Sequence, residues 1–364
     1  MQSQNSRKGE ALDLAALSTY LRHSSLGIRE LSHVEQFKNG FSNLTYRLDT
    51  DQGSFVLRRP PFGPRAAKAH DMLREHRVLS GLQPVFAKAP KPYLMCENEA
   101  IIGAPFYLME FVEGEIIRTQ PDNESPLIPN ERGQASAALI QTLADLHQLD
   151  ISGSKLGQLG KPEGYVGRQV EGWIKRFERA KTENVSFPDR LVEYLRSEQI
   201  ADHPGALVHN DYKFDNVIFK ARDYSQVAAV LDWEMCTVGH PTLDLGLTLA
   251  YWAHEEEVKE MPFMGINATH HSGCWRREQL VSAYALATSA GSPASQGDKI
   301  SDFNTNDLLY AFVFGNFKIA GIVQQIYARY AAGHTKDPRF SQLQHVVNYL
   351  MMRANRAVSV ESIE

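Results

Sequence analysis

The run from Leu207 to Phe219 restricts the possible fold more than any other part of the sequence. Two short apolar segments flank a polar stretch in this run, a pattern that predicts a turn held between two buried strands. Within the turn, His209, Asp211 and Asn216 have the form H-x-D-x-x-x-x-N. One short loop therefore carries a carboxylate and an amide, and the flanking strands restrict where that loop can lie.

A second apolar run, from Val227 to Leu231, ends at Asp232 and is followed by Glu234. A carboxylate at the end of a buried strand is costly unless a cation or hydrogen-bond donors replace the lost water. Asn216 precedes one predicted strand and Asp232 follows the next, and such oxygen ligands suit a hard divalent metal. Each residue alone could be a turn former or a helix cap, but the set in this order predicts a metal site.

The length and charge of the chain exclude several classes of protein. At 364 residues it is longer than a single hydrophobic core usually extends, so two domains or lobes are expected. Lys and Arg number 38 against 43 Asp and Glu, whereas nucleic-acid-binding proteins usually carry a basic excess. A hydrophobic content of 43% is typical of folded globular proteins rather than disordered chains.

The cysteines and the apolar runs indicate the compartment. Cys96, Cys236 and Cys274 are too few and too scattered for a disulfide framework. No apolar run approaches the roughly 18 residues of a membrane span, and residues 1–10 lack the apolar stretch of a signal peptide. We therefore expect a cytoplasmic protein that binds neither nucleic acid nor membrane.

Hydrophobic periodicity divides the chain into a strand-rich part and a helical part. Residues 1–10 are expected to form a flexible tail, and residues 11–112 a small lobe. The predicted elements of this lobe are helices over 11–21 and 72–82, a hairpin with strands 44–48 and 55–58 around a turn at 51–53, and strands over 90–96 and 106–112. Residues 113–364 are predicted to form a larger helical lobe, with helices over 131–149, 165–180 and 314–333.

Together these motifs resemble the protein-kinase-like fold, and most closely its aminoglycoside phosphotransferase and choline kinase branch. The resemblance extends from the predicted hairpin through His209–Asn216 and Asp232 to Gly239–Gly246 and the C-terminal helix. Within this family, Leu57–Pro61 and Arg168–Trp173 are similar to the kinase domain fused to acyl-CoA dehydrogenases and to its free-standing bacterial relatives. The implied fold is α+β and bilobal, with a small antiparallel-sheet N-lobe and a larger helical C-lobe.

The resemblance also assigns roles in phosphoryl transfer, which depends on positioning, cations and metal ions. Asp211 matches the catalytic aspartate that orients the acceptor hydroxyl or accepts its proton, and Lys213 matches a cation facing the transferred phosphate. Asn216 and Asp232 match the two magnesium ligands, which Glu234 would assist. The implied cofactors are ATP and Mg²⁺.

In the small lobe the matches are weaker. Residues 38–43, which include Gly40, Ser42 and Asn43, occupy the place of the phosphate-covering loop but contain a single glycine. A plain hairpin turn is the more common explanation of such a segment. Arg58 matches the ATP-phosphate lysine, with a change of cation geometry, and Glu75 matches its ion-pair partner. Read alone, Arg58 would more often be a surface charge on an edge strand.

Four further features of the sequence bear on the site, and two of them, the strand over 106–112 and the helix over 165–180, allow more than one interpretation. The strand over 106–112 matches the kinase hinge, in which backbone groups of Glu110 and Val112 would bind adenine, although any buried strand has this pattern. In a regular strand the side chain of Arg59 points to the face opposite that of Arg58, and we expect it to lie in solvent. Asp244 matches a buried carboxylate that braces the catalytic loop. The helix over 165–180 carries Arg168, Lys175, Arg176 and Arg179, which form either a solvated face or a basic wall for a phosphate- or CoA-bearing acceptor.

The favoured function is an ATP- and Mg²⁺-dependent kinase that phosphorylates the hydroxyl of a small molecule. The subgroup resemblance suggests a hydroxyacyl-CoA or hydroxy acid as acceptor, by analogy alone. One alternative is a catalytically silent nucleotide-binding module that acts through partners, although Asp211, Asn216 and Asp232 are all present. Another is an aminoglycoside- or choline-type kinase, and the basic helix disfavours aminoglycosides. A protein kinase is disfavoured because Asp244 follows Asp232 too closely for an activation loop.

Overall fold

The computed structural model describes residues 3–7, 9–37, 43–62, 71–118, 127–290, 304–334 and 338–364. The chain divides into two compact units. The first comprises Met1–Glu113 together with Ala228–Met235, and the second comprises Gly114–Val227 together with Cys236–Glu364. The sequence analysis assigned everything after residue 112 to the helical lobe, whereas the structure groups Ala228–Met235, and with it Asp232, with the first unit.

A six-stranded sheet forms the centre of the first unit, with the strand order β1-β2-β3-β4-β6-β5. Its strands are β1 (Ser3–Asn5), β2 (Leu31–Gln36), β3 (Leu44–Thr50), β4 (Gly53–Arg59), β5 (Pro92–Cys96) and β6 (Phe106–Glu110). The β1–β2 pair is parallel, and the other pairs of this sheet are antiparallel. The unit also contains α1 (Leu14–His23) and α2 (Met72–Leu82), and α2 has the predicted bounds.

Several residues of the N-terminal segment, which is predicted to be a flexible tail, contact the sheet. Ser3–Asn5 forms an edge strand, the backbone N–H of Arg7 donates to the side-chain oxygen of Gln36 at 2.8 Å, and the hydroxyl of Tyr46 donates to the carbonyl of Glu10 at 2.7 Å. These contacts use backbone groups and polar side chains. Hydrophobic periodicity therefore gives no signal for this strand.

The predicted hairpin is confirmed as β3 and β4. Gly53 pairs with Thr50 and has a φ of 106°, a backbone conformation that glycine adopts without strain. In β4, Arg58 pairs with Thr45 on one side and with Tyr107 on the other. Arg58 therefore lies on an interior strand of the sheet, and its interpretation as an edge-strand surface charge is wrong.

Arg59 is only 1% exposed, so the expectation that its side chain lies in solvent is wrong. Its guanidinium donates to the carbonyls of Pro60 at 3.0 Å and Ile102 at 2.8 Å, and it lies 3.6 Å from the ring centroid of Phe62. Because successive side chains of a strand point to opposite faces of the sheet, the sequence predicts which way Arg59 points, but it does not predict whether that face is buried. Carbonyl oxygens and an aromatic face from other segments take the place of water around the charge.

Helices make up most of the second unit. They are α3 (Pro129–His147), α4 (Tyr165–Arg179), α5 (Asp189–Ser197), α6 (Pro241–Tyr251), α7 (Glu255–Glu260), α8 (Arg277–Ala290), α9 (Thr305–Ala331) and α10 (Leu343–Val360). Two small sheets accompany them. One pairs β7 (Ala206–Val208) with β10 (Thr237–Gly239) in antiparallel fashion, and the other joins β8 (Val217–Lys220) and β9 (Asp223–Val230).

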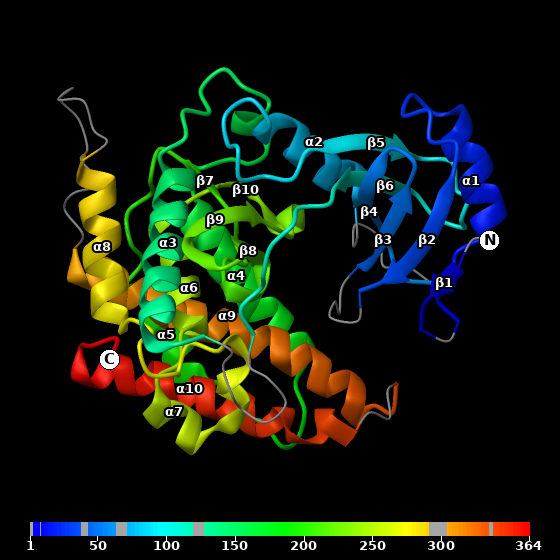
Figure 1. Ribbon diagram of the computed structural model, residues 1–364. Coiled ribbons are helices and arrows are strands. Elements are labelled where there is room, and N and C mark those ends of the chain that lie inside the picture. The colour runs from blue at the N-terminus through cyan, green and yellow to red at the C-terminus, as the bar shows by residue number, and fades with distance from the viewer. Residues whose placement is uncertain are drawn as a thin grey trace. The chain divides into compact units, whose positions relative to one another are not determined.

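Two of these helices, α6 and α10, pack along α9 (Figure 1). Two glycines allow the close approach of α6 to α9. A Cβ atom on Gly246 would lie 2.4 Å from the carbonyl carbon of Ala311, and one on Gly315 would lie 2.8 Å from the carbonyl oxygen of Gly246. Five aromatic residues of α9 are buried, namely Tyr310, Phe312, Phe314, Phe317 and Tyr327.

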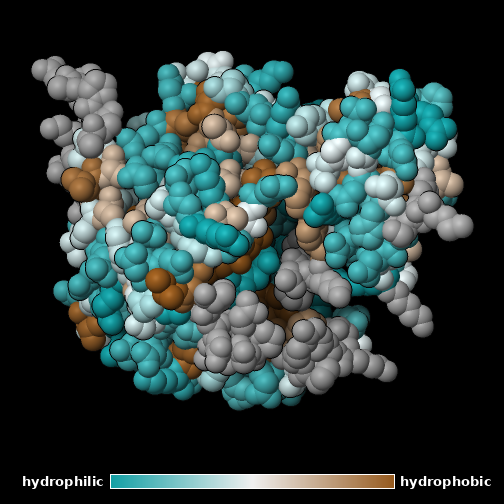
Figure 2. All heavy atoms as spheres, in the orientation of Figure 1, coloured by the Kyte–Doolittle hydropathy of each residue, from teal (hydrophilic) through white to brown (hydrophobic). Residues whose placement is uncertain are grey.

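Hydrophilic residues cover most of the face shown in Figure 2, and hydrophobic residues occupy separate patches on it. Among the described residues, no helix has both the length and the apolar character needed to cross a bilayer. Within the described residues, Cys96, Cys236 and Cys274 form no disulfide.

The close contact of α6 with α9 predicts the effect of adding one methyl group. We expect Gly315→Ala to lower the free energy of unfolding by ~1–3 kcal/mol, because the new Cβ would overlap with the backbone of α6. Urea denaturation measures the change. Gly167→Ala on α4 is the control, since its Cβ meets only a flexible glutamine side chain at 3.3 Å. Equal stability of the two variants would contradict the packing argument.

Candidate functional site

A charged cluster in the first unit has Arg58 at its centre. One guanidinium nitrogen of Arg58 lies 3.2 Å from a carboxylate oxygen of Glu75 on α2, and another lies 2.9 Å from a carboxylate oxygen of Asp232. The side chains of Arg58 and Glu75 are 8% and 1% exposed, so this ion pair is buried. The structure brings together three residues that the sequence analysis selected from three separate segments.

Asp232 lies just after the end of β9, in an unusual backbone conformation. Its φ is 66°, in the left-handed region that aspartate tolerates better than most residues. A short 3-10 turn over Trp233–Met235 follows, and the indole N–H of Trp233 donates to the carbonyl of Val230 at 2.8 Å. Because Trp233 is buried, this turn is held firmly, and it determines where the Asp232 carboxylate points.

Two side chains from elsewhere in the unit reach Glu234. The amide nitrogen of Asn43 donates to its carboxylate at 3.0 Å, and the guanidinium of Arg74 donates to its backbone carbonyl at 2.6 Å. Asn43 therefore lies beside the 3-10 turn that contains Glu234. The other two predicted residues of the phosphate-covering loop, Gly40 and Ser42, lie outside the described residues.

The carboxylates of this cluster repel one another. Burial, together with the charges of Asp232 and Glu234, raises the pKa of Glu75 to about 7 against the opposing attraction of Arg58. A divalent cation beside Asp232 and Glu234 would offset this repulsion. Among the described residues, no three His, Cys, Asp or Glu side chains are arranged to hold a metal unaided. Mg²⁺ usually binds through one or two carboxylates plus phosphates and water, so the residues present fit a nucleotide-bound Mg²⁺.

The predicted hinge residues lie at the end of β6. The backbone N–H of Glu110 donates to the carbonyl of Lys91 at 2.8 Å, and the Glu110 carboxylate accepts from the N–H of Lys91 at 3.1 Å. Val112 follows the strand and is half-buried. Because the N–H of Glu110 is already used within the sheet, a contact with adenine at this residue would involve its carbonyl oxygen.

In the second unit, Asp211 lies on the loop after β7. The ammonium of Lys213 is 2.7 Å and 2.9 Å from its two carboxylate oxygens, and the amide nitrogen of Asn216 donates to one of them at 2.9 Å and to the Asp211 carbonyl at 2.8 Å. This leaves the amide oxygen of Asn216 as its candidate metal ligand. The structure brings these three predicted residues together on one loop.

Asp244 at the start of α6 holds the backbone of the same loop. One of its carboxylate oxygens accepts from the N–H of His209 and the other from the N–H of Asn210, each at 2.7 Å. His147 lies 3.1 Å from the first oxygen. Burial alone would raise the pKa of Asp244, but the hydrogen bond and charge of His147 and the charge and backbone N–H of His209 lower it below its usual value.

Sequence reasoning missed two residues near Asp211. Lys318 on α9 donates from its ammonium to the carbonyl of Asn210 at 3.1 Å, and the ring of Tyr251 lies 4.5 Å from the ammonium of Lys213. A signal for Lys318 exists in the sequence, because it is a lone charge within the otherwise apolar stretch of α9. The sequence gives no comparable signal for Tyr251, which occupies an ordinary helix end.

The basic residues of α4 have different environments. Arg168 is used locally, because its guanidinium donates to the carbonyls of Lys161 and Glu163. Arg176 is exposed and lies 4.7 Å from the ring centroid of Trp173, while Lys318 lies 5.7 Å from the same ring. Arg168 is thus held by its own segment, whereas Arg176 and Lys318 place two cations beside one indole.

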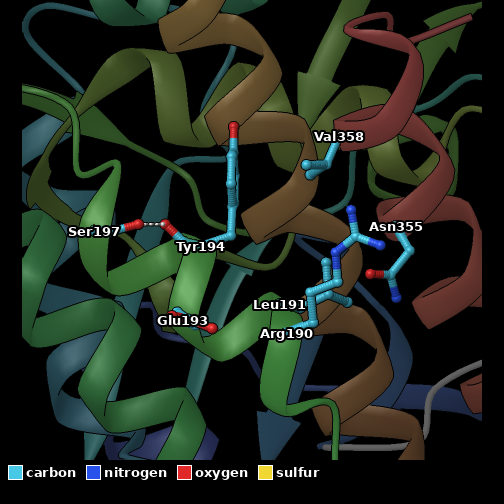
Figure 3. Close-up of a pocket in the computed structure, with 7 residues that line it drawn as sticks. All are labelled: Arg190, Leu191, Glu193, Tyr194, Ser197, Asn355 and Val358. Carbon is cyan, nitrogen blue, oxygen red and sulfur yellow. Dashed lines mark hydrogen bonds between the residues drawn. The ribbon is translucent and has the colours of Figure 1, made fainter.

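A separate pocket of about 230 Å³ lies between α5 and α10 in the second unit (Figure 3). Its lining residues are Arg190, Leu191, Glu193, Tyr194, Ser197, Asn355 and Val358. None of the residues that the sequence analysis selected lines this pocket. The residues selected from the sequence instead form two separate groups, the Arg58 cluster in the first unit and the Asp211 loop in the second.

The chain belongs to the phosphotransferase enzyme family, whose model matches residues 33–277. It is 35% identical over 335 residues to acyl-CoA dehydrogenase family member 11 of Rattus norvegicus, and this match covers 89% of the chain. The chain spans only 40% of the length of that relative.

Solved structures share the fold. A provisionally assigned aminoglycoside phosphotransferase from Ralstonia eutropha matches with a TM-score of 0.72 and 30% identity, covering 95% of this chain and 99% of that one. A thermostable mutant of another aminoglycoside phosphotransferase, in a ternary complex with ADP and hygromycin B, matches with a TM-score of 0.57 and 14% identity over 93% and 98% of the two chains. The predicted family and the protein-kinase-like fold are confirmed, and the family supports an enzyme that transfers phosphate.

The raised pKa of Glu75 predicts how stability changes with pH. The folded protein holds this proton more tightly than the unfolded chain, so the stabilisation is present at low pH and is lost as the pH rises from about 4.5 to about 7. Glu75→Gln removes this titration. Relative to wild type, we expect its free energy of unfolding to increase by ~1–3 kcal/mol between about pH 5 and about pH 7.5.

Urea denaturation over this pH range, in EDTA and without nucleotide, measures the effect. Glu256→Gln on α7 serves as the control, because Glu256 is exposed. A Glu75→Gln variant whose stability follows the same pH curve as the wild type would contradict the assignment.

Proposed function

We propose that this protein is an ATP- and Mg²⁺-dependent kinase that transfers the γ-phosphoryl group to a hydroxyl of a small molecule. Membership of the phosphotransferase enzyme family supports the transfer of phosphate, and a protein of the same fold that binds ADP supports a nucleotide donor. The observation that carries the proposal is the environment of Asp211. Its carboxylate is 24% exposed, and both oxygens are held by neighbours on the same loop.

In the proposed reaction, the acceptor hydroxyl oxygen bonds to the γ-phosphorus while the bond from that phosphorus to the β–γ bridging oxygen breaks. ADP leaves, and the hydroxyl proton passes to the Asp211 carboxylate. Lys213 and Asn216 fix the orientation of this carboxylate, so that it can align the hydroxyl without reorganisation. Bound Mg²⁺ would neutralise charge on the phosphates, with Asn216 and Asp232 as its proposed ligands and Glu234 assisting.

The nucleotide is assigned to the first unit. Arg58 is proposed to bind a phosphate oxygen while Glu75 holds it in place, and Asn43 is proposed to donate to phosphate. The carbonyl of Glu110 and the backbone of Val112 are proposed to bind adenine. From the sequence alone, Gly40 and Ser42 are also proposed to belong to the loop that covers the phosphates.

For the acceptor, we propose a hydroxyacyl-CoA or a hydroxy acid. The support is the similarity to acyl-CoA dehydrogenase family member 11, of which this chain spans 40%. The exposed Arg176 on α4 provides a cation for an anionic acceptor. We also propose a cytoplasmic location, because Cys96, Cys236 and Cys274 form no disulfide in the described part of the chain, as is usual for proteins of reducing compartments.

The first test is the release of ADP from Mg·ATP across a panel of acceptors. The panel contains 3- and 4-hydroxyacyl-CoAs, free hydroxy acids, choline, homoserine, sugars and aminoglycosides. We expect acceptor-dependent release that falls by at least ~10³-fold in Asp211→Asn, because the group that aligns the hydroxyl is removed. Asp189→Asn, an exposed carboxylate at the start of α5, is the control. Full activity in Asp211→Asn, or ATP binding without turnover on any acceptor, would contradict the proposal.

A second test concerns the metal. Asp232→Asn keeps the shape of the side chain and tolerates the positive φ at this position, but it removes one negative charge. We expect nucleotide affinity to fall at least ~10-fold in the presence of Mg²⁺, and by much less when EDTA removes the metal. Titration calorimetry with ATP under both conditions measures this difference. An equal loss with and without Mg²⁺ would contradict the role of Asp232 as a metal ligand.

A further inference from the structure

We propose that Lys318 on α9 is a positioning residue that fixes the peptide between Asn210 and Asp211, and thereby the direction of the Asp211 carboxylate. The proposal rests on the proposed function only in taking Asp211 as the residue that aligns the acceptor hydroxyl. The contact itself is a feature of the second unit and can be tested without any acceptor.

Both polar atoms of this peptide have partners. The carbonyl of Asn210 accepts from the ammonium of Lys318 at 3.1 Å, and the N–H of Asp211 donates to the Nδ1 atom of His209 at 3.2 Å. The side-chain oxygen of Asn210 lies 3.3 Å from the same ammonium. With the N–H of Asn210 held by Asp244 at 2.7 Å, the backbone on both sides of the Asn210 Cα atom is fixed.

The backbone at Asn210 has a φ of 67°, in the left-handed region that asparagine adopts more readily than most residues. This left-handed conformation is strained for most residues and persists where surrounding contacts impose it. If the carbonyl of Asn210 lost its partner, the peptide could rotate, and the side chain that follows it would turn as well. Catalysis is sensitive to misplacement of about 1 Å, so a modest rotation would reduce the rate.

The crossing of α6 and α9 brings Lys318 to this peptide. Gly246 lies two residues after Asp244 on α6, and Gly315 lies three residues before Lys318 on α9. Because these glycines allow the two helix backbones to touch, the helices that hold the N–H and the carbonyl of Asn210 are fixed relative to each other. The packing of α6 against α9 thus positions both Asp244 and Lys318, the two side chains that bind the backbone of Asn210.

The charge of Lys318 indicates a use beyond packing. The residue is only 2% exposed, and it forms no ion pair with a carboxylate among the described residues. A buried ammonium without such a pair is destabilising, so a methionine would satisfy packing at lower cost. Burial lowers the pKa of Lys318 to about 8, with Arg176 and Lys213 acting in the same direction and Asp244 and Asp211 opposing them.

Lys318→Met tests the contact, because it keeps an unbranched buried side chain and removes the ammonium. In the free protein, we expect amide hydrogen exchange of the peptide covering 209–216 to accelerate at least ~10-fold. Lys259→Met is the control, since Lys259 is 71% exposed on α7. Unchanged exchange over 209–216 in Lys318→Met would overturn the proposal, whatever the acceptor proves to be.

Turnover gives the second readout. With the acceptor found in the ADP-release panel, we expect kcat to fall ~10–100-fold in Lys318→Met while the Kd for Mg·ATP changes less than about twofold. Wild-type kcat should decrease above about pH 8, where the ammonium loses its proton, and this decrease should be absent in Lys318→Met. The pKa of Lys213 is raised, so Lys213 remains charged over this range.

A second variant and the Asp211→Asn result distinguish the possible failures. Lys318→Arg keeps a permanent charge, and we expect it to restore part of kcat without the decrease above about pH 8. Lys318→Leu, which also removes the ammonium, replaces Lys318→Met in every readout if that variant does not fold. Wild-type kcat in Lys318→Met, alongside an inactive Asp211→Asn, would overturn this inference and leave the kinase proposal intact. Full activity in Asp211→Asn would instead overturn the kinase proposal.

Discussion

The carboxylate of Asp244 is the contact on which the geometry of the Asp211 loop depends. It accepts two backbone hydrogen bonds at 2.7 Å from consecutive residues, His209 and Asn210, and is itself fully buried. Charge-assisted bonds of this length are stronger than neutral ones. They fix the left-handed backbone conformation of Asn210, whose φ is 67° and which asparagine adopts more readily than most residues.

The burial of Asp244 explains why so much polar structure surrounds it. An ionised carboxylate in the core must be fully hydrogen-bonded, and His147 supplies the remaining contact from α3 at 3.1 Å. His147 is in turn held by the hydroxyl of Tyr284 on α8, 2.6 Å from its other ring nitrogen. Three helices therefore fix one loop, and a substitution in any of them can affect Asp211 without touching it.

Sequence patterns predicted those parts of the molecule that depend on local order. The bounds of α2, the β3–β4 hairpin and the grouping of Asp211, Lys213 and Asn216 follow from periodicity, turn residues and spacing within short segments. The burial of Arg59 and the contact of Lys318 do not, because their partners are distant in the chain. Ile102 is 43 residues from Arg59, and Asn210 is 108 residues from Lys318. Such contacts depend on tertiary packing, which a local pattern does not contain.

The presence of Arg58 where related kinases are expected to have lysine is explained by the same reasoning. Its two terminal nitrogens contact Glu75 at 3.2 Å and Asp232 at 2.9 Å, so one residue holds carboxylates from two different segments. A planar guanidinium can divide its donors between two acceptors, whereas the ammonium of lysine is a compact point charge. In the folded protein, Arg58 thus holds the Asp232 carboxylate at a turn where the backbone φ is 66°.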